Sequence, residues 1–153
     1  MKAIVTVCTL CVLLSAGPLR ACTFDGVLTN PFTESYEGAF DVALATQREV
    51  SNGTVSMPAL REGIAGLQQT TWWLKLLNKN LRAVHMEEMY FYVIDNHLWA
   101  KKTADRLEVH VAKPVQPEKV LIVSAAALSS LVSRQISYQD AQTLGVARMI
   151  SLP

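Results

Sequence analysis

The stretch MYFYVIDN, residues 89–96, decides the fold of this 153-residue chain. Apart from one methionine, its first six residues are aromatic or β-branched, and such a run is typical of a strand that is covered on both faces. Asp95 and Asn96 then favour a two-residue hairpin turn. We therefore expect residues 97–103 to return as a second, antiparallel strand and the middle of the chain to be a sheet.

The sheet is predicted to continue toward the carboxyl terminus. Apolar residues alternate with other side chains over residues 107–112, which predicts a strand with one solvated face. Pro114 and Pro117 close this strand. The run KVLIV, residues 119–123, is apolar after its first residue, as expected of a short buried strand.

Two short helices and a last strand are predicted after this run. Ser124 can cap a helix over the next eight residues. Ser137 and Asp140 form a variant of the capping box that opens a second helix, and Gly145 ends it. Residues 146–152 then return as the final strand.

A long helix is predicted over residues 32–50, before the sheet. Thr33 or Ser35 can cap its start, and Asn52 with Gly53 provides a stop because both tolerate a left-handed backbone. Six apolar side chains recur at helical spacing and are expected on one inward face: Phe32, Tyr36, Ala39, Phe40, Ala43 and Leu44.

A second helix is predicted to begin with Ser56 as cap and Pro58 in its first turn, and to end near Val84. Trp72 and Trp73 widen its apolar stripe. The doubled tryptophan is compatible with packing between helix and sheet, with the wall of a ligand pocket, and with anchoring at a membrane interface.

These elements together predict the fold class. Two N-terminal helices precede a mixed, mainly antiparallel sheet of about five strands, with two short helices before the last strand. We therefore expect a single α+β domain over residues 22–153.

Residues 1–21 are typical of a signal peptide. Lys2 supplies a positive start, residues 3–14 are almost wholly apolar, and Gly17 with Pro18 breaks the run before the small Ala21. The apolar run is shorter than the roughly 18 residues that span a membrane. We expect removal of residues 1–21 and a location in the bacterial periplasm, the alternatives being a retained anchor or a buried helix.

Cys22 is the only cysteine outside that segment, because Cys8 and Cys11 lie within it. Residues 19–22, LRAC, resemble the lipobox of bacterial lipoproteins, from which Arg20 departs. An acylated Cys22 would tether the protein to a membrane. The alternative is an unmodified or disulfide-linked thiol at the start of the mature chain.

The charge balance argues against binding to nucleic acid. The chain has 14 basic and 13 acidic residues, and removal of Lys2 and Arg20 with the signal segment leaves 12 basic against 13 acidic. No cluster of lysine and arginine appears that could follow a phosphate backbone.

No catalytic motif is present in the sequence. His85, His97 and His110 lie in different predicted elements and do not have the spacing of a zinc site. Asp95 beside His97 can serve as acid, base or ligand, or have a structural role. Because phosphate loops, dinucleotide fingerprints and nucleophile elbows are also missing, we expect neither an enzyme nor a bound metal or cofactor.

Residues 119–149 resemble the carboxy-terminal part of sterol-carrier-protein-2-like domains. That part of the family runs from a strand through two short helices to a strand, and the matching positions here are Leu128, Leu131, Ile136, Ala141, Gly145 and Val146. The family usually has a glycine near Arg134, which this chain lacks. The resemblance implies an apolar cavity between sheet and helices for a lipid-like ligand, and no catalysis.

Two functions are compatible with these observations. The first is a noncatalytic accessory or interaction protein that uses its sheet edge or tryptophan-bearing helix against another envelope protein. The second is a carrier of an apolar, lipid-like or quinone-like small molecule, with a cavity lined by Trp72, Trp73, Phe91, Trp99 and Leu128. An apolar cavity of at least about 300 Å³ favours the carrier, whereas a filled core with an exposed apolar patch favours the interaction protein.

Overall fold

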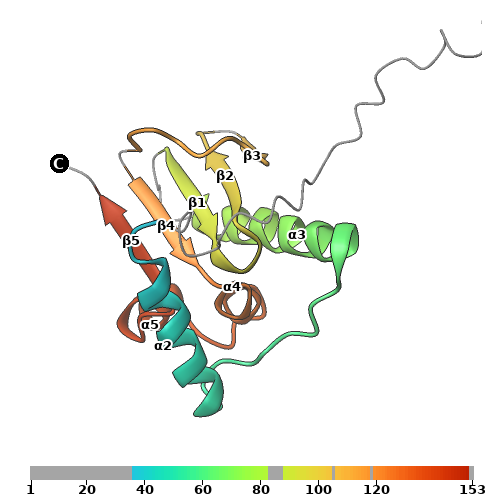
Figure 1. Cartoon of the computed structure of the whole chain (residues 1–153), viewed down its shortest axis with the longest axis vertical. Coiled ribbons are helices and arrows are strands. Elements are labelled where there is room, and N and C mark those ends of the chain that lie inside the picture. The colour runs from blue at the N-terminus through green and yellow to red at the C-terminus, as the bar shows by residue number, and fades with distance from the viewer. Residues whose placement is uncertain (1–35, 83–87, 105, 118, 152–153) are drawn as a thin grey trace, which may run out of the picture. The chain divides into compact units, whose positions relative to one another are not determined.

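A five-stranded mixed sheet packed against helices makes up the described part of the chain (Figure 1). The computed structural model describes residues 36–82, 88–104, 106–117 and 119–151, which all belong to one unit, residues 35–153. The elements are, in chain order, α2 (Ala39–Ser51), α3 (Gly63–Arg82), β1 (Met89–Val93), the 3-10 turn η1 (Ile94–Asn96), β2 (Leu98–Lys102), β3 (Leu107–Val109), β4 (Lys119–Val123), α4 (Ala125–Val132), α5 (Tyr138–Thr143) and β5 (Ala147–Ser151).

The strands lie in the order β3-β2-β1-β4-β5. Strand β1 pairs antiparallel with β2, which places Phe91 opposite Ala100, and parallel with β4, which places Phe91 opposite Leu121. The outer strands β3 and β5 pair antiparallel with β2 and β4. The prediction of an α+β domain with a mixed, mainly antiparallel sheet is therefore confirmed.

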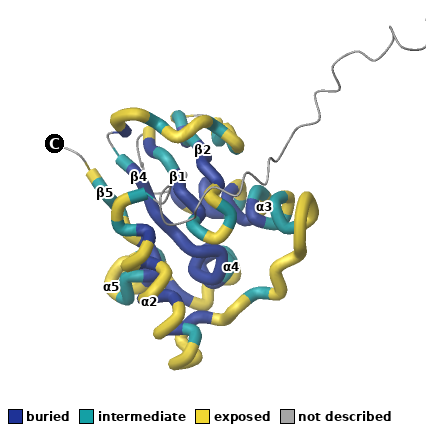
Figure 2. Tube along the Cα trace, in the orientation of Figure 1, coloured by how far each residue is buried: buried dark blue, intermediate teal, exposed yellow. Residues whose placement is uncertain are grey.

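Alternate residues of the central strands enter two separate apolar clusters. On one face, Phe91 belongs to the same cluster as Leu74 of α3 and Leu128 of α4. On the other face, Tyr92 belongs to a cluster with Val42 of α2. Figure 2 shows β1, β4 and α4 largely buried. Because both faces of β1 and β4 are covered, the sequences of these strands do not alternate between apolar and polar residues.

The connection between β1 and β2 differs from the predicted two-residue turn. Pairing stops at Val93 and Leu98, and η1 followed by His97 in the left-handed conformation (φ 51°) links the strands. The Oδ2 atom of Asp95 accepts a hydrogen bond from the Ala125 amide at 2.6 Å. The turn is longer than predicted because it also holds the start of α4.

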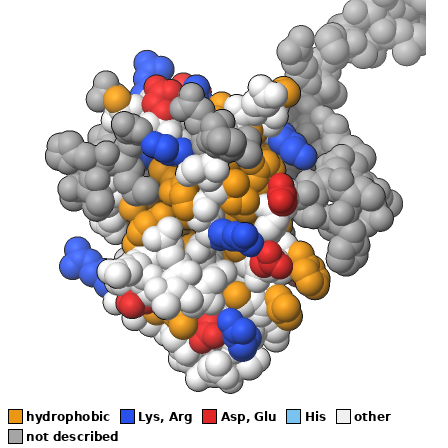
Figure 3. All heavy atoms as spheres, turned by 90° about the vertical axis from the view of Figure 1, so that its left-hand side faces the viewer, with side chains coloured by type: hydrophobic (Ala, Val, Ile, Leu, Met, Phe, Trp, Pro, Cys, Tyr) orange, Lys and Arg blue, Asp and Glu red, His pale blue; other side chains and the backbone are white. Residues whose placement is uncertain are grey.

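Helix α2 begins at Ala39, inside the predicted range 32–50, and buries only part of the predicted face, namely Ala39 with Tyr36 packed just before it. Phe40 and Leu44, which the spacing places inward, are 69% and 61% exposed. Figure 3 shows that apolar side chains reach the surface between charged ones on this side of the molecule. The buried face carries smaller or polar residues: Ala39, Val42, Ala45, Thr46 and Glu49. Phe32, Thr33 and Ser35 lie outside the described residues.

Close packing explains this choice of face. Gly38 caps helix α2 with φ 83°, and a Cβ atom there would be in ordinary contact with Ile122 and Ile150, 3.5 Å away. Farther along, Thr46 Oγ1 donates a hydrogen bond to Ser124 Oγ at 3.0 Å. The helix thus approaches the sheet through small residues, and its one inward hydroxyl has a partner, so the larger side chains face outward.

Helix α3 begins later than predicted, at Gly63 and not near Pro58. The segment before it folds back along the helix: Gln69 Nε2 donates to the Ala59 carbonyl, and the Arg61 amide donates to Gln69 Oε1, both at 3.2 Å. These hydrogen bonds occupy the Ala59 carbonyl and the Arg61 amide, which would pair within the helix if α3 began a turn earlier. Within the described ranges, no helix is long and apolar enough to cross a membrane.

The carboxy-terminal elements follow the predicted signals. The hydroxyl of Ser124 caps α4 by accepting from the Ala127 amide at 3.1 Å. Ser137 and Asp140 form the predicted capping box of α5, and Gly145 follows this helix with φ 76°. The strand, helix, helix, strand order of residues 119–151 is thus present, while the relationship to sterol-carrier-protein-2-like domains stays a prediction.

Candidate interaction site

The five residues predicted to line a ligand cavity lie in three different surroundings. Trp73, Phe91 and Leu128 belong to the buried cluster between the sheet and helices α3 and α4. Trp99 belongs to the cluster on the opposite face of the sheet. Trp72 is 57% exposed. The structure therefore brings three of these residues together and separates the other two, and ligand binding by any of them stays a prediction.

Helix geometry explains why adjacent tryptophans differ. Successive residues of an α-helix point about 100° apart, so neighbours can lie on opposite sides of the boundary between core and solvent. The buried stripe of α3 contains Thr70, Leu74, Leu77 and Leu81. Trp73 falls beside this stripe, whereas Trp72 falls on the outward side with Ile64, Gln68 and Lys75, which are also exposed.

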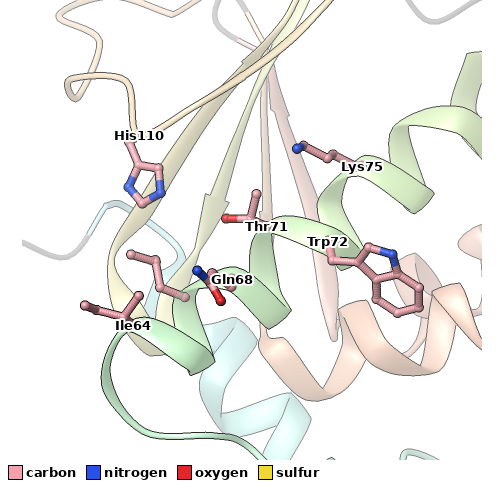
Figure 4. A pocket seen from close by; sticks show the side chains of 7 residues that line it. Ile64, Gln68, Thr71, Trp72, Lys75 and His110 are labelled. Atoms are coloured by element: carbon pink, nitrogen blue, oxygen red, sulfur yellow. The ribbon is translucent and has the colours of Figure 1, made fainter.

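The first of two hollows beside Trp72 has a volume of about 400 Å³ and lies between α3 and the segment after β3. Its wall combines the apolar side chains of Ile64, Leu67 and Trp72 with polar ones from Gln68, Thr71, Lys75 and His110. Figure 4 shows Thr71 between Lys75 and His110, while Trp72 points to the other side of the helix. The hollow therefore offers an apolar wall next to several hydrogen-bond donors.

The second hollow, of about 430 Å³, lies on the other side of Trp72. The segment before α3 contributes Arg61, and the helix contributes Ala65, Gln68, Gln69, Trp72 and Trp73. The side chain of Gln69 holds this segment in place through the two hydrogen bonds described above. Below, we call Trp72 together with these two hollows the Trp72 surface.

His110 reaches the first hollow through a break in the sheet. The amides of His110 and Val111 both donate to the Trp99 carbonyl, at 3.0 and 3.2 Å, and His110 has φ 65°. Two residues opposite one, with the first in the left-handed region, form a β-bulge. The bulge ends β3 at Val109, earlier than predicted, and redirects the imidazole toward α3.

The charged side chains described at the Trp72 surface, Lys75 and Arg61, are basic. Lys75 and His110 line the first hollow and Arg61 lines the second, and neither hollow has an Asp or Glu among the lining residues that the structure describes. The surface therefore combines an exposed tryptophan with cationic or ionisable nitrogen groups, a combination suited to recognising anionic and apolar groups together.

The sequence contains part of the signal for this site. Ile64, Gln68, Trp72 and Lys75 follow the spacing i, i+4, i+8, i+11 of a single helix side, so their proximity can be read from the sequence once the orientation of α3 is known. His110 has no such signal, because it joins the site through the sheet and its bulge.

Asp95 and His97, the candidate acid and base, each make a hydrogen bond within the fold. Asp95 accepts from the start of α4, and Tyr92 Oη lies 2.8 Å from His97 Nδ1. Among the described residues, no group of three His, Cys, Asp or Glu side chains is arranged to hold a metal ion. His85 and Cys22 lie outside those residues.

Three pKa shifts mark polar groups away from the Trp72 surface. Burial, and secondarily the nearby Glu37 charge, raises the pKa of Tyr36. Burial also raises the pKa of Tyr138. Hydrogen bonds from the side chain and backbone of Ser137 lower the pKa of Asp140, which follows from its place in the capping box.

Comparison with protein-family models found no match, and comparison with curated proteins found none either.

Proposed function

We propose that this protein is an exported, noncatalytic interaction protein that binds a polypeptide partner in the cell envelope through the Trp72 surface. The observation that carries the proposal is the position of Trp72, which is 57% exposed between two hollows. Tryptophans that dominate protein interfaces lie in such places, where a partner buries a large rigid ring and fills adjacent pockets.

The packing of the interior supports an interaction protein over a carrier. Trp73, Phe91 and Leu128 are each less than 10% exposed and belong to one cluster between the sheet and the helices. The hollows beside Trp72 instead lie along the surface of α3, each with room for one or two partner side chains. The backbone that carries Trp72 is also anchored, because Leu74 and Leu77 on the opposite side of the helix lie in the core.

The envelope location rests on residues 1–21, which have the pattern of a signal peptide. Intact-mass analysis of the mature protein tests this part of the proposal. Cleavage after Ala21 supports export, and a diacyl or triacyl addition on Cys22 would make the protein a membrane-tethered lipoprotein. A mature protein that still begins at Met1 would contradict it.

One observation favours a small-molecule carrier as a second candidate. The first hollow has an apolar wall, and its volume of about 400 Å³ lies within the range of small-ligand sites. Native mass spectrometry of protein purified from its own envelope separates the two functions. A lipid-sized adduct that is lost in Trp72→Ala would favour the carrier.

The interaction itself can be tested with a random dodecapeptide library displayed on phage. We expect selected synthetic peptides to bind with micromolar affinity and to shift the NMR signals of the Trp72 indole, Ile64 and Gln68. Trp72→Ala should weaken binding at least about tenfold, as expected for a central interface tryptophan. Phe40→Ala is the matched control, since Phe40 is a still more exposed aromatic on α2 that lines neither hollow.

Either of two binding results would contradict the proposed function. Equal binding by the wild type and Trp72→Ala, or peptides that shift the α2 signals instead, would show that the Trp72 surface is not the interaction site.

A further inference from the structure

We infer that the partner segment bound by the Trp72 surface is acidic, with a carboxylate next to an aromatic or branched aliphatic side chain. This inference rests on the proposed function and names the chemistry of the partner. It follows from the charge of the two hollows, the arrangement of their polar groups and the backbone of His110.

Charge complementarity is the first support. Each hollow has a basic side chain, Lys75 in the first, which His110 also lines, and Arg61 in the second, and no acidic residue of the described ranges lines either one. Glu62 follows Arg61 in the chain but belongs to neither wall. The whole chain is nearly neutral, so this concentration of basic groups around one exposed tryptophan is a local property.

The arrangement of the first hollow is the second support. In Figure 4, Thr71 lies between Lys75 and His110, Ile64 lies at the same end of the hollow as His110, and Trp72 lies at the other end with Lys75. A carboxylate among Lys75, Thr71 and His110 would accept charge-assisted hydrogen bonds. Apolar neighbours on either side of that carboxylate would contact Ile64 at one end of the hollow and Trp72 at the other.

The backbone of His110 is the third support. A non-glycine residue with φ 65° is strained relative to glycine. Such strain is concentrated at functional sites, where the fold retains a particular side chain despite its cost. At this bulge a glycine would relieve the strain but would remove the imidazole from the hollow.

Two shallow hollows beside Trp72 favour a peptide over an anionic membrane. Trp72 stands between two hollows, and a segment of chain can place side chains on both sides of the ring. A flat lipid headgroup layer would contact Trp72 and leave the hollows unfilled. We therefore treat vesicle binding as an outcome that would overturn the inference.

The experiment uses the full mature protein and the peptides selected from the dodecapeptide library. We expect Asp and Glu to be enriched beside aromatic or branched residues in the selected sequences. Replacing those acids by Asn and Gln should weaken binding about tenfold or more, and raising the salt concentration should weaken the acidic peptides only. Lys75→Glu should cause a similar loss, measured by isothermal titration calorimetry.

Two further variants keep the test specific. Lys79→Glu is the matched control for Lys75→Glu, because Lys79 is exposed on the same helix but lines neither hollow. It should leave affinity within about twofold of wild type, the small change expected of a screened surface charge. His110→Gly should not lower the melting temperature, yet it should weaken the acidic peptide severalfold, which separates a role in binding from a role in folding.

The possible results separate failure of the acidic partner from failure of the proposed interaction function. Neutral or basic peptides that bind and lose affinity in Trp72→Ala would leave the proposed function intact and overturn the acidic partner. Equal losses in Lys75→Glu and Lys79→Glu would also overturn it, since they would reflect general charge. Binding to vesicles of phosphatidylglycerol and phosphatidylethanolamine, lost in Trp72→Ala, with no selected peptide would overturn both.

Discussion

Three non-glycine residues in the described ranges have a left-handed backbone, namely His97, His110 and Arg134. His97 closes the turn between β1 and β2, and His110 forms the bulge at the Trp72 surface. Arg134 follows α4, where its amide donates to the Leu131 carbonyl at 3.2 Å. Each residue stands where the chain changes direction, so at these three positions the path of the chain takes precedence over backbone preference.

Replacing Arg134 with glycine should stabilise the protein. The Gln135 amide donates to the Ser130 carbonyl at 2.9 Å, which together with the Arg134 bond makes the helix-ending motif that favours glycine at this position. We expect Arg134→Gly to raise the free energy of unfolding by about 0.5–1 kcal/mol, measured by urea denaturation. The glycine that sterol-carrier-protein-2-like domains place near this point would serve the same conformation.

Ser133→Gly is the control for that prediction. Ser133 is the adjacent residue, but its φ of −77° is right-handed. Glycine there should lower the free energy of unfolding by up to about 1 kcal/mol. Destabilisation of similar size in both variants would show that the left-handed backbone at Arg134 carries no strain.

Asp140 should make the stability of the protein depend on pH in the acid range. Ser137 donates to its carboxylate from both the side chain and the backbone and lowers its pKa. A lowered folded-state pKa gives a contribution that is complete above about pH 5 and is lost as the pH falls through the folded pKa. Asp140→Ala should therefore destabilise the protein at pH 7 and have little effect near pH 2.

Urea denaturation of both proteins at several pH values provides the measurement. The difference in free energy of unfolding should shrink steadily below about pH 5. A difference that stays constant down to pH 2 would mean that the charge of Asp140 does not contribute to the cap.

At the scale of single elements, the start of α3 depends on contacts outside the helix. Ser56 and Pro58 form a good start signal in the sequence, but the segment before Gly63 lies along the helix and hydrogen-bonds Gln69. Gly66 allows this close approach, because a Cβ atom there would overlap the Arg61 carbonyl oxygen. Arg61 lines the second hollow.

Gly66→Ala should therefore destabilise the protein even though alanine favours a helix. We expect a loss of about 1–3 kcal/mol, typical of an added methyl group that forces the backbone to move, measured by thermal and urea unfolding. Helix preference alone predicts a gain of up to about 1 kcal/mol. A gain would show that the segment at Arg61 moves away from the helix without cost.

At the scale of the whole molecule, the most stable region should be the parallel pair of β1 and β4. Their central residues, including Phe91, Val93, Leu121 and Ile122, have no exposed surface, and each strand has a neighbour on both sides. The edge strand β3 is only three residues long and ends at a bulge. The sheet should therefore open from that edge.

Native-state hydrogen exchange followed by NMR tests this order. Amides of β1 and β4 should exchange only through global unfolding, at least about 100-fold more slowly than those of β3. Uniform protection across the five strands would show that the sheet opens as a single unit.

Most of the fold can be predicted from the sequence because its signals are local. The mostly aromatic and β-branched run at residues 89–94 indicates a strand covered on both faces, and Ser124, Ser137 and Gly145 act on residues within one helical turn. Such signals specify the kind and order of the elements. The ends of an element shift where groups distant in the chain bind to it, as Asp95 does by accepting a hydrogen bond from the start of α4.

The site could be predicted only in part. The sequence marks Trp72 as unusual, and helical spacing places Ile64, Gln68 and Lys75 on its side of α3. It does not show which of Trp72 and Trp73 is outside, because that depends on how the helix is rotated against the sheet. For the same reason the larger apolar side chains of α2, Phe40 and Leu44, face outward.

The sequence by itself determined the α+β class and the order of helices and strands, because propensity, periodicity and capping act between near neighbours. Only the tertiary structure decided which helix faces are buried, where α3 begins and that His110 and Lys75 line the same hollow. Those features depend on packing between segments that are distant in the chain. The Trp72 surface therefore exists only once the bulge after β3 and the outward side of α3 are brought together.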